Sequence, residues 1–407
     1  MAKPKLALIP ATQGSKLYSV LPADGVGDFT FSRNSAATRI NKDGLIETVA
    51  VGKSRLNYPL IDGVVNGCPS HLLEPSRLQK IQYSEDFSND YWVKSSAIIT
   101  SNLIISPDGS LNASLLKGDG LSSFPRIQST VSGSGQISFS VFVKKELSDD
   151  VTIYLSGTGI GGGAGTSSVY KYTFSTDSFL ITSGGTVNSS ESTSFGNDWV
   201  RLTLNYTTTT ITGVRIYSKY ASTSTDGVYI YGAQVEQGSY VTSYIPNYGT
   251  SAGITRVAET ANGAGDASTF NDSEGVLMAE ISALANDGTS RQISLSSGSS
   301  ATNKVSLNYT ATSNQVQAFI RSGGSISFNE TITLSDSTNL NKIALKYKSN
   351  DFALFVNGFK VASDLSGNAP TALSVLDFDD ADGTSDLYGN TKQLQYFDSA
   401  LNDSDLE

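Results

Sequence analysis

Apolar residues in this chain recur at every second position over short runs, and this pattern constrains the fold more than any other feature. Every second residue is apolar from Ile137 to Val143 and again from Val200 to Leu204. A period of two is typical of a strand that buries one face of its sheet. We therefore predict an all-β protein, with helix confined to short turns and the last residues.

A break in the alternating pattern divides the chain. With 407 residues it is longer than one ordinary core supports, so we expect two or three domains. The stretch 228–259 begins as a strand, is interrupted at Gly238 and leaves in an extended path through Pro246 before apolar residues resume at Val257. We therefore divide the chain into residues 1–80, 81–247 and 248–407.

The second and third parts both contain many short strands with turn signals between them. In the second part this density of strands predicts a two-sheet jelly roll, with strands at 97–105, 136–144, 151–155, 169–174, 199–206, 213–217 and 227–236. In the third part Asn357-Gly358 predicts a tight hairpin. A second β-sandwich is expected there, with strands at 275–281, 291–295, 304–309, 315–320, 341–347, 351–356 and 389–397.

Residues 1–80 lack helical periodicity and long apolar runs. Pro and Gly separate their short apolar stretches, and a few short strands are expected, such as 28–33 and 44–50. So few apolar side chains cannot offset the roughly 1–2 kcal/mol of backbone entropy lost per ordered residue. We predict an extended arm that packs on a neighbour, with a small independent β domain as the alternative.

The charge balance supports a separate role for this arm. Residues 1–80 hold ten Lys and Arg against six Asp and Glu, a net charge of +4, whereas the whole chain carries −10. Such asymmetry predicts that the ends face different partners. Our hypothesis is that the arm drives homo-oligomerisation.

Composition argues against several classes of protein. An acidic chain without a basic, aromatic-interleaved patch is not expected to bind nucleic acid. The single Cys cannot form an intramolecular disulfide, and one His and one Cys cannot build the usual zinc sites. There is no long apolar run and no signal peptide, so we expect a soluble protein without membrane insertion, assembled in the cytoplasm.

No constellation of catalytic residues is visible in the sequence. Cys68 and His71 lie three residues apart in an extended, Pro-bounded segment, and we interpret them as a packed thiol and a surface imidazole rather than as nucleophile and base. Glycoside hydrolysis needs two carboxylates held near one another. The neighbours Glu85 and Asp86 face opposite sides of a strand, as do Asp149 and Asp150, so neither pair predicts such a site.

Two stretches carry candidate binding residues. Tyr91 and Trp92 are candidates for stacking on a sugar ring, although aromatic residues in sandwiches more often pack in the core. The acidic loop 377–383 concentrates oxygen ligands of the kind that calcium takes, with a solvated loop as the alternative. Its candidate ligands are Asp377, Asp379, Asp380 and Asp382.

A series of short motifs runs through the first 260 residues. They are FSR at 31–33, ATRI at 37–40, KDGLIE at 42–47, RLNYP at 55–59, LLEP at 72–75, YSEDF at 83–87, GAQVE at 232–236 and TSYIP at 242–246. In this order they resemble a recurrent family of tailed-phage structural proteins, which includes head-fibre, tail-fibre and carbohydrate-binding virion proteins. Residues 81–247 also look like the carbohydrate-binding jelly rolls of glycan-degrading enzymes. The hairpin at 357–358 and the strand 389–397 are similar to laminin-G-like, concanavalin A-type domains, which often carry calcium at loop rims.

These resemblances imply a non-enzymatic structural protein of the phage virion. Its arm would attach to other virion proteins, at the capsid, the portal or neck, or the tail, and its sandwiches would adhere to polysaccharide. Phage fibres are commonly three-fold, so a trimer is the expected oligomer. Two alternatives stay open: a glycan-degrading enzyme that uses carboxylates, and a monomeric lectin.

Overall fold

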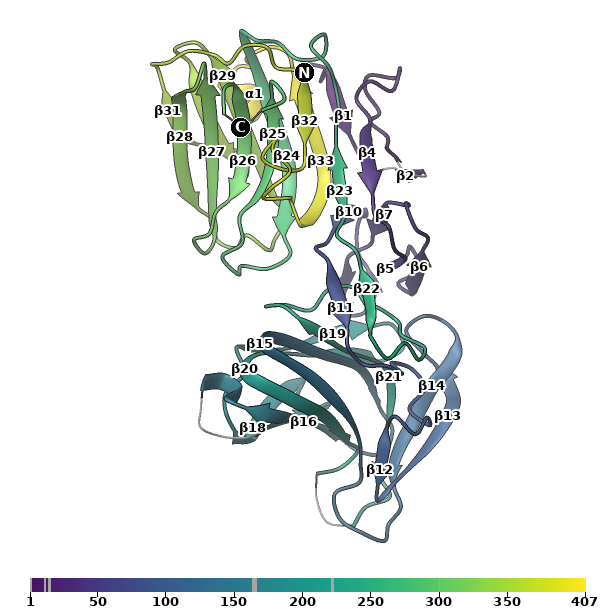
Figure 1. Cartoon of the computed structure of the whole chain (residues 1–407). Helices are drawn as coiled ribbons and strands as arrows, with labels where there is room; N and C mark the ends of the chain where they lie inside the picture. Colours follow the sequence, from purple (N-terminus) through teal and green to yellow (C-terminus); the bar gives the residue numbers. More distant parts are fainter. Residues whose placement is uncertain (1, 11, 14–15, 163–166, 221–222, 300) are drawn as a thin grey trace.

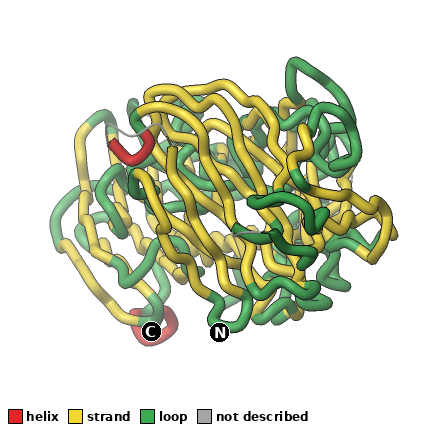
Figure 2. The backbone as a smooth tube through the Cα atoms, turned by 90° about the horizontal axis from the view of Figure 1, so that it is seen from below, coloured by secondary structure: helices red, strands yellow, loops and turns green. Residues whose placement is uncertain are grey.

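The computed structural model describes residues 2–10, 12–13, 16–162, 167–220, 223–299 and 301–407. Strands make up 54% of it and helix 2%, which confirms the predicted all-β class. Figure 2 shows how completely strands dominate; the two helical segments drawn there are a 3-10 turn at Ile160–Gly162 and α1 (Asp403–Leu406). In the described part of the chain, no helix is both long and apolar enough to cross a membrane.

Residues 81–247 form the jelly-roll lobe, drawn at the bottom of Figure 1. Two long strands, β15 and β20, pair along their whole length and pass from one layer into the other. The 199–206 and 213–217 segments, predicted as separate strands, are both part of β20. The strands of this lobe are β12 (Val93–Ser95), β13 (Ala97–Ile105), β14 (Leu111–Gly118), β15 (Arg126–Lys145), β16 (Asp150–Thr158), β17 (Ser167–Thr173), β18 (Ser178–Gly184), β19 (Ser189–Phe195), β20 (Trp199–Tyr217) and β21 (Gly227–Gln237).

Different strands pair with the two halves of β15 and β20, and this arrangement produces the two layers of the sandwich. One half of this antiparallel pair carries β21, β14, β13 and β19, and the other half carries β12, β16, β17 and β18. The bend falls at register shifts between Thr130 and Gly135. Alternating side chains such as Ile137 and Leu202 then fill the space between the two layers and are fully buried.

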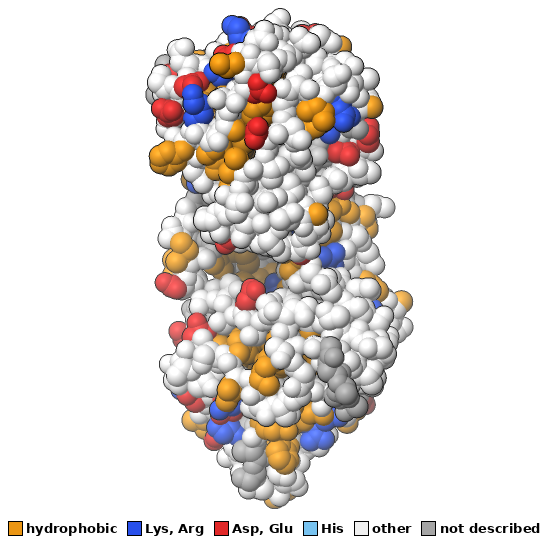
Figure 3. Space-filling view, turned by 90° about the vertical axis from the view of Figure 1, so that its left-hand side faces the viewer, with side chains coloured by type: hydrophobic (Ala, Val, Ile, Leu, Met, Phe, Trp, Pro, Cys, Tyr) orange, Lys and Arg blue, Asp and Glu red, His pale blue; other side chains and the backbone are white. Residues whose placement is uncertain are grey.

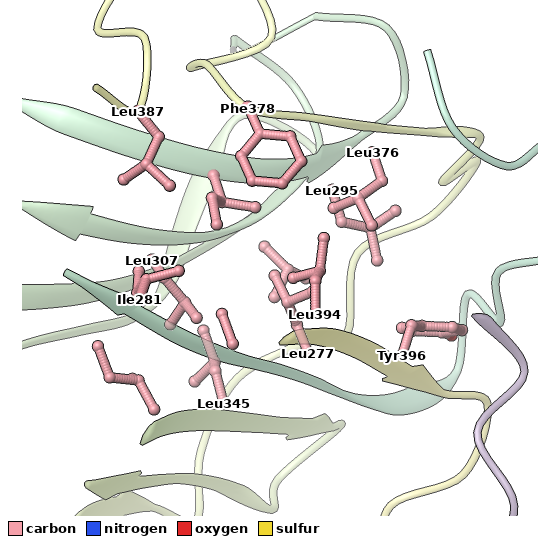
Figure 4. Close-up of a cluster of buried hydrophobic side chains, with 14 of the residues drawn as sticks. Leu277, Ile281, Leu295, Leu307, Leu345, Leu376, Phe378, Leu387, Leu394 and Tyr396 are labelled. Carbon is pink, nitrogen blue, oxygen red and sulfur yellow. The ribbon is translucent and has the colours of Figure 1, made fainter. Parts of the chain in front are cut away.

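The C-terminal lobe is a second sandwich, at the top of Figure 1. Its larger sheet has the order β31-β30-β29-β24-β33-β10-β7, and the smaller has the order β28-β27-β26-β25-β32. Figure 4 shows leucines from both sheets meeting between them. The strands contributed by the third part of the chain are β24 (Glu274–Ala283), β25 (Arg291–Ser296), β26 (Lys304–Tyr309), β27 (Gln315–Ser322), β28 (Ser325–Thr333), β29 (Asn341–Lys348), β30 (Phe352–Val356), β31 (Phe359–Asp364), β32 (Val375–Asp377) and β33 (Gly389–Phe397).

The predicted hairpin at Asn357-Gly358 is confirmed. It joins β30 to β31, and both turn residues have positive φ, 51° and 83°. This conformation is the one that an Asn-Gly pair adopts most readily in a two-residue turn.

Residues 1–80 find their neighbour within the same chain. They contribute β1 (Leu6–Leu8), β7 (Arg55–Asn57) and β10 (Ser70–Leu73) to the larger sheet of the C-terminal lobe, where β1 and β10 both pair with β33. Leu6, Phe29 and Leu73 are buried in that lobe's core. The C-terminal lobe of the same chain therefore covers the surface that we expected a sister subunit to cover. Oligomerisation stays a prediction, but the need of residues 1–80 for a neighbour no longer supports it.

The remaining short strands of residues 1–80 lie along the connection between the lobes. There β4 pairs with β23 and β11 pairs with β22, so the outgoing and returning chains run antiparallel. The strands are β2 (Thr12–Gln13), β3 (Lys16–Leu17), β4 (Phe29–Ser32), β5 (Ala37–Ile40), β6 (Ile46–Val49), β8 (Leu60–Ile61), β9 (Val64–Val65), β11 (Arg77–Gln79), β22 (Ile254–Arg256) and β23 (Thr260–Asn262).

A buried charge cluster holds this connection together; it consists of Arg33, Arg55, Glu74, Arg256 and Glu259. The Glu259 carboxylate accepts hydrogen bonds from Arg33 Nη1 at 2.6 Å and from Arg55 Nε at 2.9 Å. The Glu74 carboxylate accepts one from Arg256 Nη1 at 2.6 Å and lies 2.8 Å from Arg55 Nη2. Burial alone would raise the pKa of Glu74, but the guanidinium groups of Arg256 and Arg55 lower it to about 2. The cluster therefore stays ionised and fixes one lobe relative to the other.

The expected environments of Cys68 and His71 are reversed. Cys68 is exposed, whereas His71 is 1% exposed and lies between the rings of Phe31 and Phe378. The reason is register: His71 faces inward from β10, which is an inner strand of its sheet, whereas Cys68 precedes that strand. A catalytic pair of the two is not formed.

Candidate functional site

A polar cleft of about 720 Å³ separates the two lobes. Figure 3 looks onto this side of the molecule, and its surface is hollowed between the upper and the lower lobe. The walls come from β19, β20, the loop after β21 and three loops of the C-terminal lobe. The lining residues are Ser189, Glu191, Thr193, Phe195, Arg201, Thr203, Asn205, Ser239, Tyr240, Val241, Leu284, Ala285, Asn286, Asp287, Asn314, Ser335, Asp336 and Thr338.

The jelly-roll wall of the cleft is one face of an edge strand and its neighbour. Glu191 and Thr193 alternate along β19 and are exposed, because this layer has its apolar side in the core. On β20, Asn205 is 4% exposed. Its amide donates to Ser189 Oγ at 2.7 Å, but among the described residues its Oδ1 has no hydrogen-bond partner. This oxygen can therefore accept a hydrogen bond from a ligand or from water.

The opposite wall is built from loops that brace one another. The side-chain amide of Asn286 donates to Asn314 Oδ1 at 2.9 Å, and the backbone N–H of Asn314 donates back to Asn286 Oδ1 at 2.9 Å. Asp336 closes its own turn by accepting from the Thr338 backbone and hydroxyl at 2.8 and 2.7 Å. The polar groups of this wall are therefore fixed before any ligand arrives.

Tyr240 provides the aromatic surface of the cleft. Its ring lies 5.0 Å from the guanidinium carbon of Arg77 and 6.0 Å from that of Arg291. Burial raises the pKa of its hydroxyl, and both arginines oppose this effect. The neighbouring Ser239 donates to Asp287 Oδ2 at 2.8 Å and so ties this loop to the C-terminal lobe.

Arg201 stands at the inner end of the cleft, where a second cavity of about 220 Å³ adjoins it. Its guanidinium lies 5.2 Å from the centre of the Phe142 ring and donates to Ser140 Oγ from Nε at 3.2 Å and from Nη2 at 3.0 Å. Burial lowers its pKa to about 10, an effect opposed by the carboxylates of Glu236 and Glu74. Within the described residues, no carboxylate lies at ion-pair distance from it.

The two aromatic residues expected to bind a sugar have different environments. Trp92 is fully buried, and its indole N–H donates to the Tyr83 carbonyl at 2.7 Å. It is a core residue that a ligand cannot reach, so this part of the prediction is corrected. Tyr91 is half-buried and lines a shallow pocket of about 210 Å³ on the jelly-roll lobe, away from the cleft. Its role in binding stays a prediction.

The acidic loop does not form a metal-ligating group. In the part of the chain that the structure describes, there are no three His, Cys, Asp or Glu side chains placed to hold a metal ion. Asp377 accepts from the Gly263 N–H at 2.7 Å, and Asp379 accepts from Asn262 Nδ2 at 2.7 Å. Asp380 accepts from the Thr384 hydroxyl at 2.8 Å, and Asp382 lies on the exposed tip of the loop. Asp377, Asp379 and Asp380 thus accept hydrogen bonds that hold the loop in place.

The structure does bring two carboxylates together, although not a pair that is adjacent in sequence. The Tyr231 hydroxyl lies 3.2 Å from Glu85 Oε1 and 3.0 Å from Asp108 Oδ2, and Tyr244 also donates to Glu85 at 3.0 Å. Burial raises the pKa of Glu85. At Asp108, burial acts in the same direction, but hydrogen bonds from Ser106 and its neighbours lower the pKa below its usual value. The pair lies in an open cavity of about 270 Å³, on the edge of which Tyr248 is 73% exposed.

Comparison with known proteins finds only distant structural likenesses. No protein-family model matches the chain, and no curated protein matches it. Among solved structures, the carbohydrate-binding module CBM40 of a Ruminococcus gnavus sialidase is 18% identical, with a TM-score of 0.30 over 35% of this chain and 85% of that one. Domains LG4-5 of the mouse laminin α1 chain are 7% identical, with a TM-score of 0.25 over 86% and 96%. Trypanosoma rangeli sialidase is 10% identical, with a TM-score of 0.30 over 97% and 82%. Scores this low establish neither a common ligand nor a common activity.

Proposed function

We propose that the protein binds glycans in the cleft between its lobes. The observation that carries this proposal is the composition of the cleft: hydroxyl, amide and carboxylate groups from both lobes, braced by hydrogen bonds, around one tyrosine ring. A cleft of about 720 Å³ has the size of an ordinary ligand site, and domain interfaces are a preferred place for such sites.

The chemistry of the walls selects the ligand class. An apolar ligand would leave the amides and carboxylates desolvated and unpaired, at a cost of about 1–3 kcal/mol for each group. A polyhydroxylated ligand offers both a donor and an acceptor at each hydroxyl, so it pairs with these groups whichever type they are. A sugar ring also has apolar faces, which suit the Tyr240 ring.

We further propose that the protein is a non-enzymatic component of a tailed-phage virion that presents this cleft for adhesion. The motifs between residues 31 and 246 support this part. Several copies on one particle would make individually weak sites effective, because the second and later contacts form at a high effective concentration. Mass spectrometry of purified particles tests the location, and finding no peptide of this chain in them would remove the virion role.

A pair of variants on one strand tests the cleft. Thr193 is exposed on β19 and lines the cleft, whereas the adjacent Ser194 is exposed on the opposite side of the strand. Thr193→Trp places a bulky indole in the cleft and is expected to reduce retention on a glycan array strongly, and Ser194→Trp, the matched control, is expected to leave it unchanged. Equal retention by the two variants would show that glycans bind elsewhere or not at all.

The Glu85–Asp108 pair favours a second candidate function, glycoside hydrolysis. Two carboxylates whose environments push their pKa values apart are the signature of an acid and a base working together. In this alternative the protonated Glu85 is the acid and Asp108 is the ionised partner. A reducing-sugar assay on polysaccharides, with Glu85→Gln as the control, decides it: product release by the wild type that the variant loses would establish an enzyme.

A further inference from the structure

We infer that the glycan bound in the cleft carries a carboxylate, and that Arg201 receives it. This inference rests on the proposed function and names the ligand class of the same site. It is drawn from the inner end of the cleft, where the groups differ in kind from those on the outer walls.

Not all of the hydrogen-bond donors of Arg201 have an acceptor among the described residues. A guanidinium carries five N–H groups, and the two hydrogen bonds that Arg201 makes both go to the single hydroxyl of Ser140. Neither proton of Nη1 has a partner among the described residues, although the side chain borders both cavities. Nη2 gives one of its two protons to Ser140, so Nη1 and the second N–H of Nη2 are the donors left for a carboxylate.

Four other arginines near the cleft already pair with carboxylates, whereas Arg77 lies over the Tyr240 ring without a carboxylate partner among the described residues and is not one of the residues that line the cleft. Arg33, Arg55 and Arg256 are held in the buried charge cluster, and Arg291 pairs with Asp287 at 2.8 Å. The carboxylates that act on Arg201 from a distance are equally committed: Glu236 accepts from Thr242, and Glu74 accepts from Arg256. Keeping a partly desolvated cation without a counter-ion is costly, and a ligand anion would remove that cost.

The outer walls suit the rest of such a sugar. Glu191 and Asp336 are acceptors for sugar hydroxyls, and they repel a carboxylate placed near them. The cleft therefore has one position for a negative charge and many for neutral hydroxyls. A saccharide with a single carboxylate, such as one that ends in a uronic acid or in a nine-carbon keto acid sugar, matches this arrangement, whereas a densely sulfated chain does not.

Matched probes measure the preference. Isothermal titration of the full chain with galacturonic acid and its methyl ester, and with sialyllactose and its methyl ester, compares the same sugars with and without the charge. A carboxylate paired to a guanidinium is expected to tighten binding about ten- to hundredfold. At least one acidic probe should therefore bind at least tenfold more tightly than its neutral counterpart.

Variants assign the preference to Arg201. Arg201→Met keeps the apolar contact with Phe142 and should bind the acidic and the neutral probe equally, while Arg201→Lys, with a point charge in place of the fork, should retain part of the preference. If Arg201→Met does not fold, Asn205→Asp places a negative charge on the same wall and should weaken only the acidic probe.

The outcomes separate the two proposals. Neutral sugars that bind as tightly as acidic ones, or a preference that survives in Arg201→Met, would overturn this inference and leave glycan binding in the cleft intact. Binding that Thr193→Trp does not reduce would overturn the cleft itself. A wild-type protein that binds none of the acidic probes would overturn the carboxylate inference, and a glycan array then decides the proposed function separately.

Discussion

Replacing the only histidine should remove most of the sensitivity of the C-terminal lobe to mild acid. His71 is 1% exposed, and neither of its ring nitrogens has a hydrogen-bond partner among the described residues. Burial, assisted by the nearby charge of Arg55, lowers its pKa to about 3. The unfolded chain takes up this proton near pH 6.5, whereas the folded chain does so only near pH 3. Stability is therefore complete above pH 6.5 and is lost as the pH falls through this window.

The size of the effect follows from the two pKa values. Between pH 7.5 and pH 5, proton uptake by the unfolded chain costs the folded state roughly 2 kcal/mol. This loss of stability depends on the pKa of His71 in the unfolded chain, because His71 stays neutral in the folded protein throughout this pH range. In His71→Leu the loss should disappear, and stability at pH 7.5 should be equal or slightly higher, since no unpaired polar nitrogen is then buried.

The assay is urea unfolding of wild type and variant at both pH values, followed by far-UV circular dichroism. Tryptophan fluorescence does not report on the right part of the molecule, because Trp92 and Trp199 both lie in the jelly-roll lobe. Other titrating groups contribute equally to both proteins; the raised pKa of Asp377, about 6 because of burial, acts with the opposite sign. A variant as sensitive to acid as the wild type would refute the account of His71.

Three further predictions concern stability and are measured by urea unfolding. Glu259→Gln leaves the arginines of the buried charge cluster uncompensated and should lower the free energy of unfolding by about 3–5 kcal/mol. The control Glu47→Gln breaks the half-exposed pair with Arg39 and should lower it by under about 1 kcal/mol. Similar losses for the two variants would contradict the role of the cluster. Trp92→Phe leaves a buried carbonyl unpaired and should cost about 1–3 kcal/mol, seen as an earlier transition of the jelly-roll lobe. Gly358→Ala strains a residue at φ 83° and should cost about 1 kcal/mol, and no loss would argue against the observed turn.

Most strands that the sequence predicts bury one face, but β13 was predicted although it is mostly exposed, and β14 was missed although half of its residues are buried. Two other missed strands, β18 and β28, are mostly exposed along their length; β18 has three consecutive apolar residues, and the alternation of Ile326 and Phe328 in β28 is interrupted at Glu330. Their pairing is decided by a neighbouring strand, which a periodic pattern in one segment does not reveal.

The candidate site was less predictable than the fold. The cleft is lined by loop residues and by the exposed face of β19, whose types are those of any polar surface. Glu85 and Asp108 share a tyrosine hydroxyl although 23 positions separate them in the numbering, and adjacent carboxylates were the wrong place to look. The motifs at 31–33, 55–59 and 72–75 were recognised, but the buried charge cluster that their charged residues form was not predicted. Its ion pairs join residues far apart in the sequence, as Arg33 and Glu259 are, 226 positions apart.

The pairing of the first strands with the last one has a consequence for synthesis on the ribosome. β1 and β10 hydrogen-bond to β33, so Leu6 faces Tyr396 and His71 faces Thr391. At translation rates of about 5–20 residues per second, the start of the chain waits roughly 15–80 s for its partner to be made. During this interval the jelly-roll lobe, whose strands are contiguous in sequence, is able to fold alone while the first strands stay unpaired. Nascent chains stalled before residue 389 should therefore be cleaved by protease within residues 1–80 and resist cleavage within the jelly-roll lobe.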